Sequence, residues 1–180
     1  MDGDLSSLRS EVLHRHGERA VADVIAGTPL REALSEMILA LESETQVEML
    51  GSVLMLKDGR LFEVAAPSLP AVYNAAIDGI EVGSAVGSCG TAAHYGEPVF
   101  VDDIKTDPLW VDFRVIALEH GLRACWSMPI KDEQGRVLGT FANYYREARH
   151  PRVADFSAIE LMAGYVAKAL LASETQKQAV

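Results

Sequence analysis

The sequence predicts an α+β fold, in which an antiparallel sheet is accompanied by helices that are segregated from its strands. Two observations predict this class. Two pairs of apolar segments are each joined by a short polar turn, as in β-hairpins. Segments with helical spacing of apolar residues stand before, between and after these pairs. A chain of 180 residues with 49% hydrophobic residues fits one such domain better than two.

The N-terminal part of the chain is predicted to be helical. Residues 5–26 place apolar side chains in two helical stripes on either side of Gly17. Thr28 and Pro29 predict the start of a second helix, with Thr28 as its cap and Pro29 at its first position, where the missing N–H costs nothing. That helix is expected to run to about Glu42.

Both hairpins are predicted from the pairing of apolar runs. The first joins 49–56 to 61–66 through Asp58-Gly59. Both central positions of a tight hairpin turn need a positive φ, which Asp-Gly favours. The second joins 124–130 to 137–145 through a polar turn. Each pair is therefore expected to contribute two adjacent antiparallel strands.

Shorter elements are expected between the hairpins, and a long helix after them. Residues 155–172 carry an apolar stripe and predict a terminal helix, which is expected to fray into a polar tail at 173–180. The expected short elements are a helix at 70–78, a helix at 89–95, a strand at 99–101 and a helix at 107–120.

Composition limits the classes of partner. The formal net charge is −10 and the pI about 4.9, which argues against binding to nucleic acid or to an anionic membrane surface. The sequence shows neither an apolar run of about 20 residues nor the layout of a secretion signal. Cys89 and Cys125 form neither a CxxC pair nor a disulfide framework. A reducing, cytoplasmic location is therefore expected.

Four segments in the middle of the chain carry a family resemblance. They are 87–94 (Gly-Ser-Cys-Gly-Thr-Ala-Ala-His), 98–104, 121–130 and 135–141. Their order and spacing resemble the GAF family, the small-molecule sensing domains of bacterial signalling proteins. The resemblance implies a central sheet of five to six antiparallel strands, terminal helices on one face, and a ligand pocket formed by short helices and loops on the other.

The resemblance also implies the organisation and the function of the chain. Residues 1–28 are assigned to an N-terminal helical segment, 29–172 to the GAF domain and 173–180 to the tail. The expected function is non-catalytic sensing of an unidentified small molecule, with no cofactor identified. The domain is expected to form a homodimer through its terminal helices. It is expected to regulate a signalling output of the two-component or cyclic-di-GMP type.

Candidate ligand-binding residues come from the segments that surround the cavity in the family. Trp and Tyr suit a small organic ligand, because each combines a large apolar body with one polar tip. Alternation along 124–130 puts Trp126 and Met128 on one face and Cys125 and Ser127 on the other, and the Trp126 face is expected to meet the cavity. The candidates are Thr91, Tyr95, Asp103, Trp110, Phe113, Trp126 and Tyr144.

No metal site and no catalytic residue are predicted. The carboxylates are not expected to converge on an ion, since neighbours on an extended segment point to opposite faces and Asp107 is expected to cap a helix. They are Asp102, Asp103, Asp107 and Asp112. Some GAF domains bind haem, so His94 and His120 are considered as axial ligands of an alternative, haem-binding gas sensor. A helix-terminal role is favoured for His120.

The cysteines suggest an enzymatic alternative. The free methionine sulfoxide reductases, which share the GAF fold, have a Cys-Gly-Thr-Ala-Ala segment like 89–93. That family uses further cysteines upstream and about two dozen residues downstream, where this sequence has none. Cys89 and Cys125 lie on different predicted elements and are not expected to meet, so buried, unreactive thiols are favoured. A dimerising scaffold that binds nothing is a further alternative.

Overall fold

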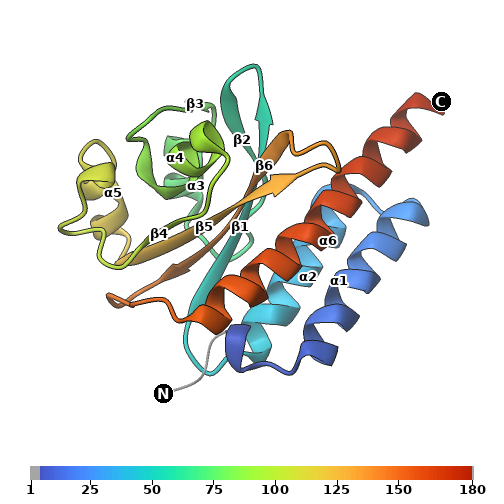
Figure 1. The fold of residues 1–180 in the computed structure, drawn as a ribbon, viewed down its shortest axis with the longest axis horizontal. Helices are drawn as coiled ribbons and strands as arrows, with labels where there is room; N and C mark the ends of the chain where they lie inside the picture. The colour runs from blue at the N-terminus through green and yellow to red at the C-terminus, as the bar shows by residue number, and fades with distance from the viewer. Residues whose placement is uncertain (1–4, 180) are drawn as a thin grey trace.

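The computed structural model of the protein describes residues 5–179. Its centre is a six-stranded antiparallel sheet in the order β3-β2-β1-β6-β5-β4, and helices cover both faces (Figure 1). The predicted α+β fold is therefore confirmed. The strands are β1 (Met49–Lys57), β2 (Arg60–Ala65), β3 (Ile80–Glu81), β4 (Val99–Val101), β5 (Ala124–Lys131) and β6 (Val137–Tyr145).

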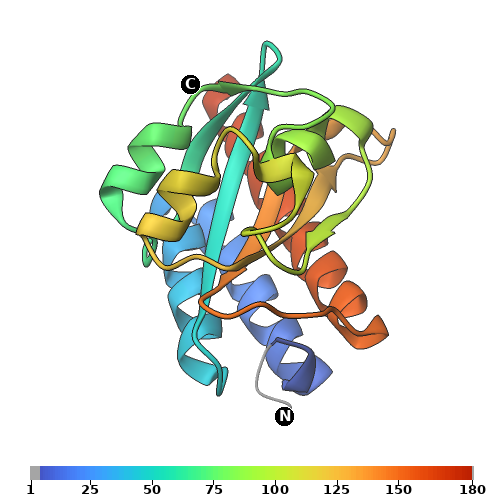
Figure 2. The ribbon, with the colours of Figure 1, turned by 90° about the vertical axis from the view of Figure 1, so that its left-hand side faces the viewer.

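The helices form two unequal layers. Three long helices lie on one face of the sheet, and short elements lie on the other, which is called the pocket face below (Figures 1 and 2). The long helices are α1 (Ser10–Ile25), α2 (Leu30–Glu44) and α6 (Val153–Gln178). The short elements are α3 (Ala71–Ile77), α4 (Gly87–Tyr95), α5 (Arg114–Glu119) and the 3₁₀ turn η2 (Pro108–Trp110), while a second 3₁₀ turn, η1 (Leu5–Ser7), precedes α1.

The first hairpin has the predicted turn. Asp58 and Gly59 adopt φ values of 50° and 73°, so both central positions are left-handed, as a type I′ turn requires. Lys57 pairs with Arg60 directly across this turn. The second hairpin is also confirmed, with β5 and β6 paired along their length.

The terminal helices pack more closely than their sequence suggests. Gly17 of α1 faces the ring of Tyr165 on α6, and a Cβ added at Gly17 would lie only 2.2 Å from that ring. The side-chain amide of Gln176 donates to the carbonyls of Val24 and Ile25, at 2.6 and 2.8 Å. Helix α6 is therefore ordered through Gln178, and the expectation that it frays from residue 173 is wrong.

Gly17→Ala is expected to destabilise the protein by about 1–3 kcal/mol, because the added methyl overpacks the contact between α1 and α6. The matched control is Gly164→Ala, also within a helix, where nothing lies within 4 Å of the added Cβ. The control gains up to about 1 kcal/mol from helix propensity alone. Urea denaturation of both variants measures the difference, and equal effects would show that the contact is not close.

Two predicted helix boundaries need correction. Pro29 occupies the N-cap position of α2, so Thr28 lies outside the helix and is not its cap. The helix expected over 107–120 is divided into η2 and α5. Asp107 caps η2 by accepting a hydrogen bond from the Leu109 N–H at 2.9 Å, as expected of a capping residue. Arg114 donates to the Asp107 carbonyl at 2.8 Å and holds the intervening turn.

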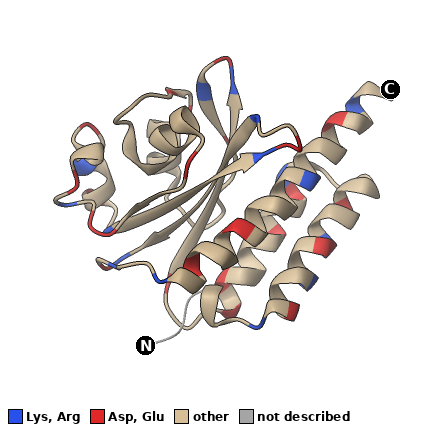
Figure 3. Ribbon diagram, viewed as in Figure 1, with Lys and Arg blue, Asp and Glu red and all other residues tan. Residues whose placement is uncertain are grey.

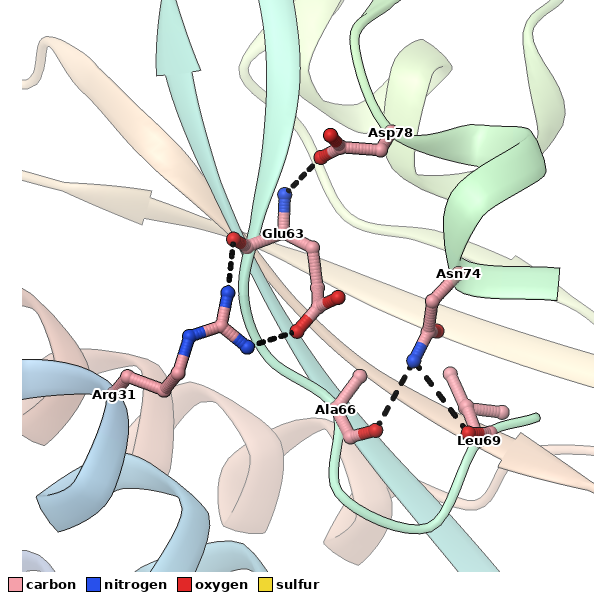
Figure 4. A network of polar contacts seen from close by, with 6 residues as sticks. All are labelled: Arg31, Glu63, Ala66, Leu69, Asn74 and Asp78. Carbon is pink, nitrogen blue, oxygen red and sulfur yellow. Dashed lines mark hydrogen bonds and ion pairs between the residues drawn. The ribbon is translucent and has the colours of Figure 1, made fainter. Parts of the chain in front are cut away.

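A polar network ties both helical layers to the edge of the sheet (Figure 4). Glu63 on β2 accepts a hydrogen bond from Arg31 of α2 at 2.7 Å, and its N–H donates to Asp78, directly after α3, at 2.7 Å. The amide of Asn74 on α3 donates to two carbonyls of the loop that follows β2. These bonds fix α3 over the pocket face.

Helix α6 is the core helix of the long-helix layer. The helix is long and apolar enough to cross a membrane, but 56% of its most apolar 18-residue stretch is buried inside the protein. Most of the alanines that would allow a second helix to approach are used within the protomer: Ala158, Ala163, Ala167 and Ala169 are buried. Packing within one chain accounts for these features, and dimerisation stays a prediction.

Candidate ligand site

The centre of the pocket face carries small and hydroxyl-bearing side chains. Side chains alternate along each strand, so every second residue of β1, β6 and β5 faces away from the long helices. Ser52 on β1 lies opposite Ala142 on β6, and Ala142 lies opposite Ser127 on β5. The neighbours of this row on the same face are Leu50, Leu54, Cys125, Thr140 and Tyr144.

The first turn of α4 lies against this row. Cys89, the third residue of α4, accepts a hydrogen bond from Ser127 Oγ at 3.4 Å, and its thiol is near enough to that of Cys125 for each to shift the pKa of the other. Ser88 Oγ donates to the Cys125 carbonyl at 2.9 Å. Cys89 contacts Ser127, which lies opposite Ala142, and it lies near Thr140 and Tyr144, which flank Ala142 along β6. Cys89 therefore lies above Ala142, whose methyl group leaves room for the sulfur.

Three aromatic side chains form a cover over the start of α4 and over Tyr144. Tyr73 comes from α3, Trp110 from η2 and Phe113 from the start of α5, in the short elements that Figure 2 shows over the strands. The Trp110 indole N–H donates to Ser88 Oγ at 3.2 Å, and the Tyr73 hydroxyl donates to the Tyr144 hydroxyl at 3.0 Å. Hydrogen bonds therefore join the cover to α4 and to the sheet.

A small cavity remains between cover and sheet. Its volume is about 20 Å³, which is room for about one water molecule, because the aromatic side chains fill the rest. It is lined by Leu54, Tyr73, Ile77, Ile80, Val86, Gly87, Ser88, Cys89, Trp110, Phe113 and Tyr144. A larger hollow of about 170 Å³ lies between α1 and α2, away from these residues.

Few charges lie near the site. Lys57 and Lys131 end β1 and β5, and otherwise β1, β5, β6 and α4 contain no Lys, Arg, Asp or Glu. Figure 3 shows the charged residues in loops, at strand ends and along the outer sides of the helices. The site therefore favours neutral groups and interacts with them through hydroxyls, thiols and aromatic faces.

The pKa values of the two thiols are shifted in opposite directions. The nearby Cys125 thiol lowers the pKa of Cys89 below its ordinary value, burial opposes this, and the nearby hydroxyls of Ser127, Thr140 and Tyr144 add to the lowering. Burial raises the pKa of Cys125 well above its ordinary value. Burial likewise raises the pKa of Tyr144, so its hydroxyl stays protonated at neutral pH. Cys89 is thus the thiol that ionises first.

Two buried hydroxyl groups, one in this row and one beside it, lack a hydrogen-bond partner of normal geometry. Ser52 Oγ and Thr140 Oγ1 are inaccessible to solvent, and neither makes a standard hydrogen bond among the described residues 5–179. A buried unsatisfied hydroxyl costs about 1–3 kcal/mol. Both face the same side of the sheet as Cys89, and Thr140 is near enough to lower the pKa of Cys89. The row therefore has unused capacity for a polar guest.

The structure brings together some of the predicted ligand residues. Trp110, Phe113 and Tyr144 line the cavity. Thr91 is buried in α4, but its hydroxyl is used within the backbone turn: it donates to the Gly87 carbonyl at 2.6 Å and accepts from the Val86 N–H at 3.0 Å. Thr91 therefore shapes the start of α4.

Tyr95 and Asp103 lie elsewhere. The Tyr95 side chain is 59% exposed at the end of α4, beside the ring of His94. Asp103 forms a two-point ion pair with Arg123, at 3.0 and 2.8 Å. The hydrogen bonds from Arg123 lower the pKa of that carboxyl. Neither residue lines the cavity, so their predicted place in it is corrected.

Trp126 lies on the opposite face of the sheet. Its ring stacks on Phe100 with centroids 5.5 Å apart, and Phe100 stacks on Phe156 of α6 at 4.3 Å. The indole N–H donates to the Arg149 carbonyl at 3.3 Å. The expectation that the Trp126 face of β5 meets the cavity is therefore wrong, and the face with Cys125 and Ser127 is the one on the pocket side of the sheet.

The carboxylates and histidines considered as metal or haem ligands lie in other surroundings. Asp102 pairs with His150, and Asp107 caps η2. Among residues 5–179 no group of three His, Cys, Asp or Glu side chains is arranged to hold a metal ion. His94 is exposed, and the ring of His120 lies 6.3 Å from that of Tyr73 without lining the cavity.

The pattern of the sequence missed the central residues of the site. Tyr73, Ser88 and Cys89 line the cavity, and Cys125 and Ser127 of β5 lie against Ser88 and Cys89. Strand alternation did group Cys125 with Ser127, and this was the available signal. The choice between the two faces of β5 required the packing.

Comparison with known proteins supports the fold and its class. A family model described as "GAF domain" matches residues 27–171. The chain is 36% identical over 165 residues to the "Methyl sulfide methyltransferase-associated sensor" of Methanosarcina acetivorans. The alignment covers 89% of this chain but only 16% of that relative.

Solved structures share the same architecture. The free methionine-R-sulfoxide reductase of Neisseria meningitidis superimposes with a TM-score of 0.71 and 20% identity, over 100% of this chain and 96% of that one. The GAF domain of a phosphoenolpyruvate-protein phosphotransferase from Coxiella burnetii gives a TM-score of 0.71 and 18% identity, over 96% and 100%. At these identities the likeness shows the fold alone.

Proposed function

The chain belongs to the GAF domain family, and we propose that it is a small-molecule-sensing domain without catalytic activity of its own, which regulates a signalling output. The observation that carries the proposal is the small cavity on the pocket face, which three aromatic side chains line together with Ser88, Cys89 and Tyr144. Beside it lies the polar row, where the hydroxyls of Ser52 and Thr140 are buried without a standard partner. A sensor-named relative at 36% identity supports it.

Ligand binding requires the cover to move. The cavity of about 20 Å³ is smaller than any organic ligand, so the structure corresponds to a closed form. The cover consists of short elements, α3, η2 and α5, joined to the site through Tyr73 and Trp110. A ligand that binds a form with the cover displaced shifts the population toward that form. The neutral surroundings favour an uncharged ligand with hydrogen-bonding groups.

Strand β5 connects the site to the long helices. Cys125 and Ser127 face the cavity side, whereas Trp126 between them packs through Phe100 onto Phe156 of α6. A displacement of β5 at the site therefore changes the packing of Trp126 and Phe100 against α6. A coupling of about 1–3 kcal/mol between ligand and output is typical of such arrangements.

The output is proposed to be of the two-component or cyclic-di-GMP type, carried by an attached or separate partner. The chain spans only 16% of the length of the sensor-named relative, so the activity of a whole protein is part of the proposal. A cytoplasmic location and a homodimer formed through the terminal helices are proposed with it. The net charge of −10 disfavours nucleic acid as the partner.

A methionine sulfoxide reductase is the second candidate, because the thiols of Cys89 and Cys125 lie close together. Reduction of free methionine sulfoxide coupled to thioredoxin and NADPH tests it, and activity that is lost in Cys89→Ser would replace the sensing proposal.

A haem sensor is less well supported, since none of the residues that line the cavity within 5–179 is a histidine. An absorption spectrum after addition of haem tests it.

The sensing proposal predicts a ligand that depends on the cover. Native mass spectrometry of the purified protein is expected to detect a retained small molecule, and the recovered compound can then be titrated. Trp110→Ala is expected to weaken its binding about tenfold or more, through loss of aromatic contact. Tyr95→Ala is the matched control with unchanged affinity, because Tyr95 is exposed and outside the cavity.

The alternative of a scaffold that binds nothing gives the opposite result. In that case no compound is retained, and the fluorescence of Trp110, isolated in a Trp126→Phe background, is unaffected by extracts of the source cells. Equal binding by Trp110→Ala and the unmodified protein would place the ligand outside the proposed site.

A further inference from the structure

We propose that Cys89 and Cys125 form a peroxide-reactive dithiol, in which Cys89 is the attacking thiolate and Cys125 is the resolving thiol. The pair lies under α4 on the pocket face, and its chemistry goes beyond ligand sensing. It does not depend on the discovery of an organic ligand.

The first argument is the contact between the two thiols. Cys89 lies in the first turn of α4, against the face of β5 that carries Cys125 and Ser127, and the two thiols are near enough to shift each other's pKa. Ser127 donates to Cys89, and Ser88 donates to the Cys125 carbonyl, so the two chain segments are joined on both sides of the pair. The sulfurs therefore need only local movement to form a bond.

The second argument is the stabilisation of a thiolate at Cys89. The Ser127 hydroxyl donates to its sulfur, and the Cys125 thiol and the hydroxyls of Thr140 and Tyr144 lie close by. The N-terminal turn of a helix also favours a thiolate. These donors lower the pKa of Cys89, although burial acts against them. At neutral pH the reactive species is thus formed at Cys89 rather than at Cys125, whose pKa is raised by burial.

The third argument is the pair of buried hydroxyls without standard partners. Ser52 and Thr140 flank Ala142, above which Cys89 lies. An oxygen atom added to the Cys89 sulfur is a strong acceptor, so it supplies what these hydroxyls lack. The free-energy cost of burying these hydroxyls without a partner is then removed in the oxidised form, whereas it remains in the reduced form.

The fourth argument is selection by size. Cys89 lines the cavity of about 20 Å³, which has room for about one water molecule. Hydrogen peroxide, with two non-hydrogen atoms, is the peroxide closest to this size. A peroxide with a bulky substituent, or free methionine sulfoxide, does not fit unless the cover opens. The closed form is therefore already suited to the smallest oxidant.

The chemistry proceeds in two balanced steps. The Cys89 thiolate attacks one oxygen of hydrogen peroxide, so that an S–O bond forms and the O–O bond breaks. Hydroxide leaves and takes up the proton that the thiol lost on ionisation, which gives water and Cys89 sulfenic acid. The sulfur of Cys125 then attacks the Cys89 sulfur, expelling a second water and forming a disulfide. The two thiols together lose two electrons, which the peroxide gains, and a cellular dithiol can reverse the change.

The unmodified chain provides the first test. Stoichiometric hydrogen peroxide is expected to remove two hydrogens from the mass of the monomer, and peptide mapping is expected to find Cys89 joined to Cys125. The rate at Cys89 is expected to reach half its plateau at a pH below about 8.5, the ordinary thiol value. Only mixed or intermolecular disulfides, or oxidation no faster than that of the unfolded chain, would overturn the proposal.

Variants separate the two roles. Cys125→Ser is expected to accumulate sulfenic acid at Cys89 that dimedone traps, whereas Cys89→Ser is expected to leave Cys125 unlabelled. Thr140→Val is expected to slow oxidation about tenfold, as the loss of one hydrogen bond of about 1.4 kcal/mol implies. Circular dichroism checks folding, with Cys89→Ala as a second variant. Equal labelling of both single variants, or an unchanged rate in folded Thr140→Val, would contradict the assigned roles.

Discussion

Trp126→Ala is expected to destabilise the protein by about 3–5 kcal/mol, the usual cost of truncating a buried tryptophan. The Trp126 side chain is fully buried, and its ring contacts Phe100 and Tyr145 at centroid distances of 5.5 and 4.7 Å. The substitution also leaves the Arg149 carbonyl without the indole N–H that donates to it. Urea denaturation followed by circular dichroism measures the change in the free energy of unfolding.

Two controls make this result specific. Trp126→Phe retains most of the stacking and is expected to cost less than Trp126→Ala. Tyr95→Ala removes an exposed aromatic side chain and is expected to stay within about 0.5 kcal/mol of the unmodified protein. If Trp126→Ala kept full stability but lost ligand binding, the sequence-based assignment of Trp126 to the cavity would be restored.

Gly139→Ala is expected to cost about 3 kcal/mol, because β6 is enclosed by β1 on one side and β5 on the other. A Cβ at Gly139 would lie 2.0 Å from the backbone oxygen of Leu54, and a backbone oxygen cannot move aside like a flexible side chain. The pairing of β1 with β6 must therefore shift locally. The free energy of unfolding and the amide exchange rates of β1 measure the effect.

Gly135→Ala is the matched control in the turn between β5 and β6. Gly135 has a φ of 78°, with nothing within 4 Å of an added Cβ, so only backbone strain of about 1–2 kcal/mol is expected. Gly139→Ala should also slow the oxidation of Cys89, because Thr140 and Ala142 follow on the same strand. Equal costs at both glycines would show that the contact with β1 is not tight.

Local patterns were sufficient for the elements whose causes are local. The turn at Asp58-Gly59 was predictable, because both positions need a positive φ and few residue pairs accept it at low cost. Both hairpins followed from their apolar runs. The division of the helix expected over 107–120 was not predictable, because Arg114 stabilises the break through carbonyls that approach it only in the fold.

The orientation of β5 shows why the site was harder to predict. A strand with one solvated face reveals its core side through polar residues, but Ala124 to Ile130 are all buried, because helices cover both faces of the sheet. Alternation therefore separated Trp126 from Cys125 without indicating which of them meets the cavity. Either the face with the large Trp126 side chain or the face with the small Cys125 and Ser127 side chains was compatible with a place at the cavity.

The order and spacing of residues along the chain were enough to identify the α+β class, the hairpins and the GAF family, since these depend on periodicity, turn chemistry and motif order. The proximity of Cys89 to Cys125 and the near-complete filling of the cavity depended on the three-dimensional structure. Those features arise from strand register and from the docking of α4 and the cover, which join residues far apart in the chain, and no local pattern contains that information.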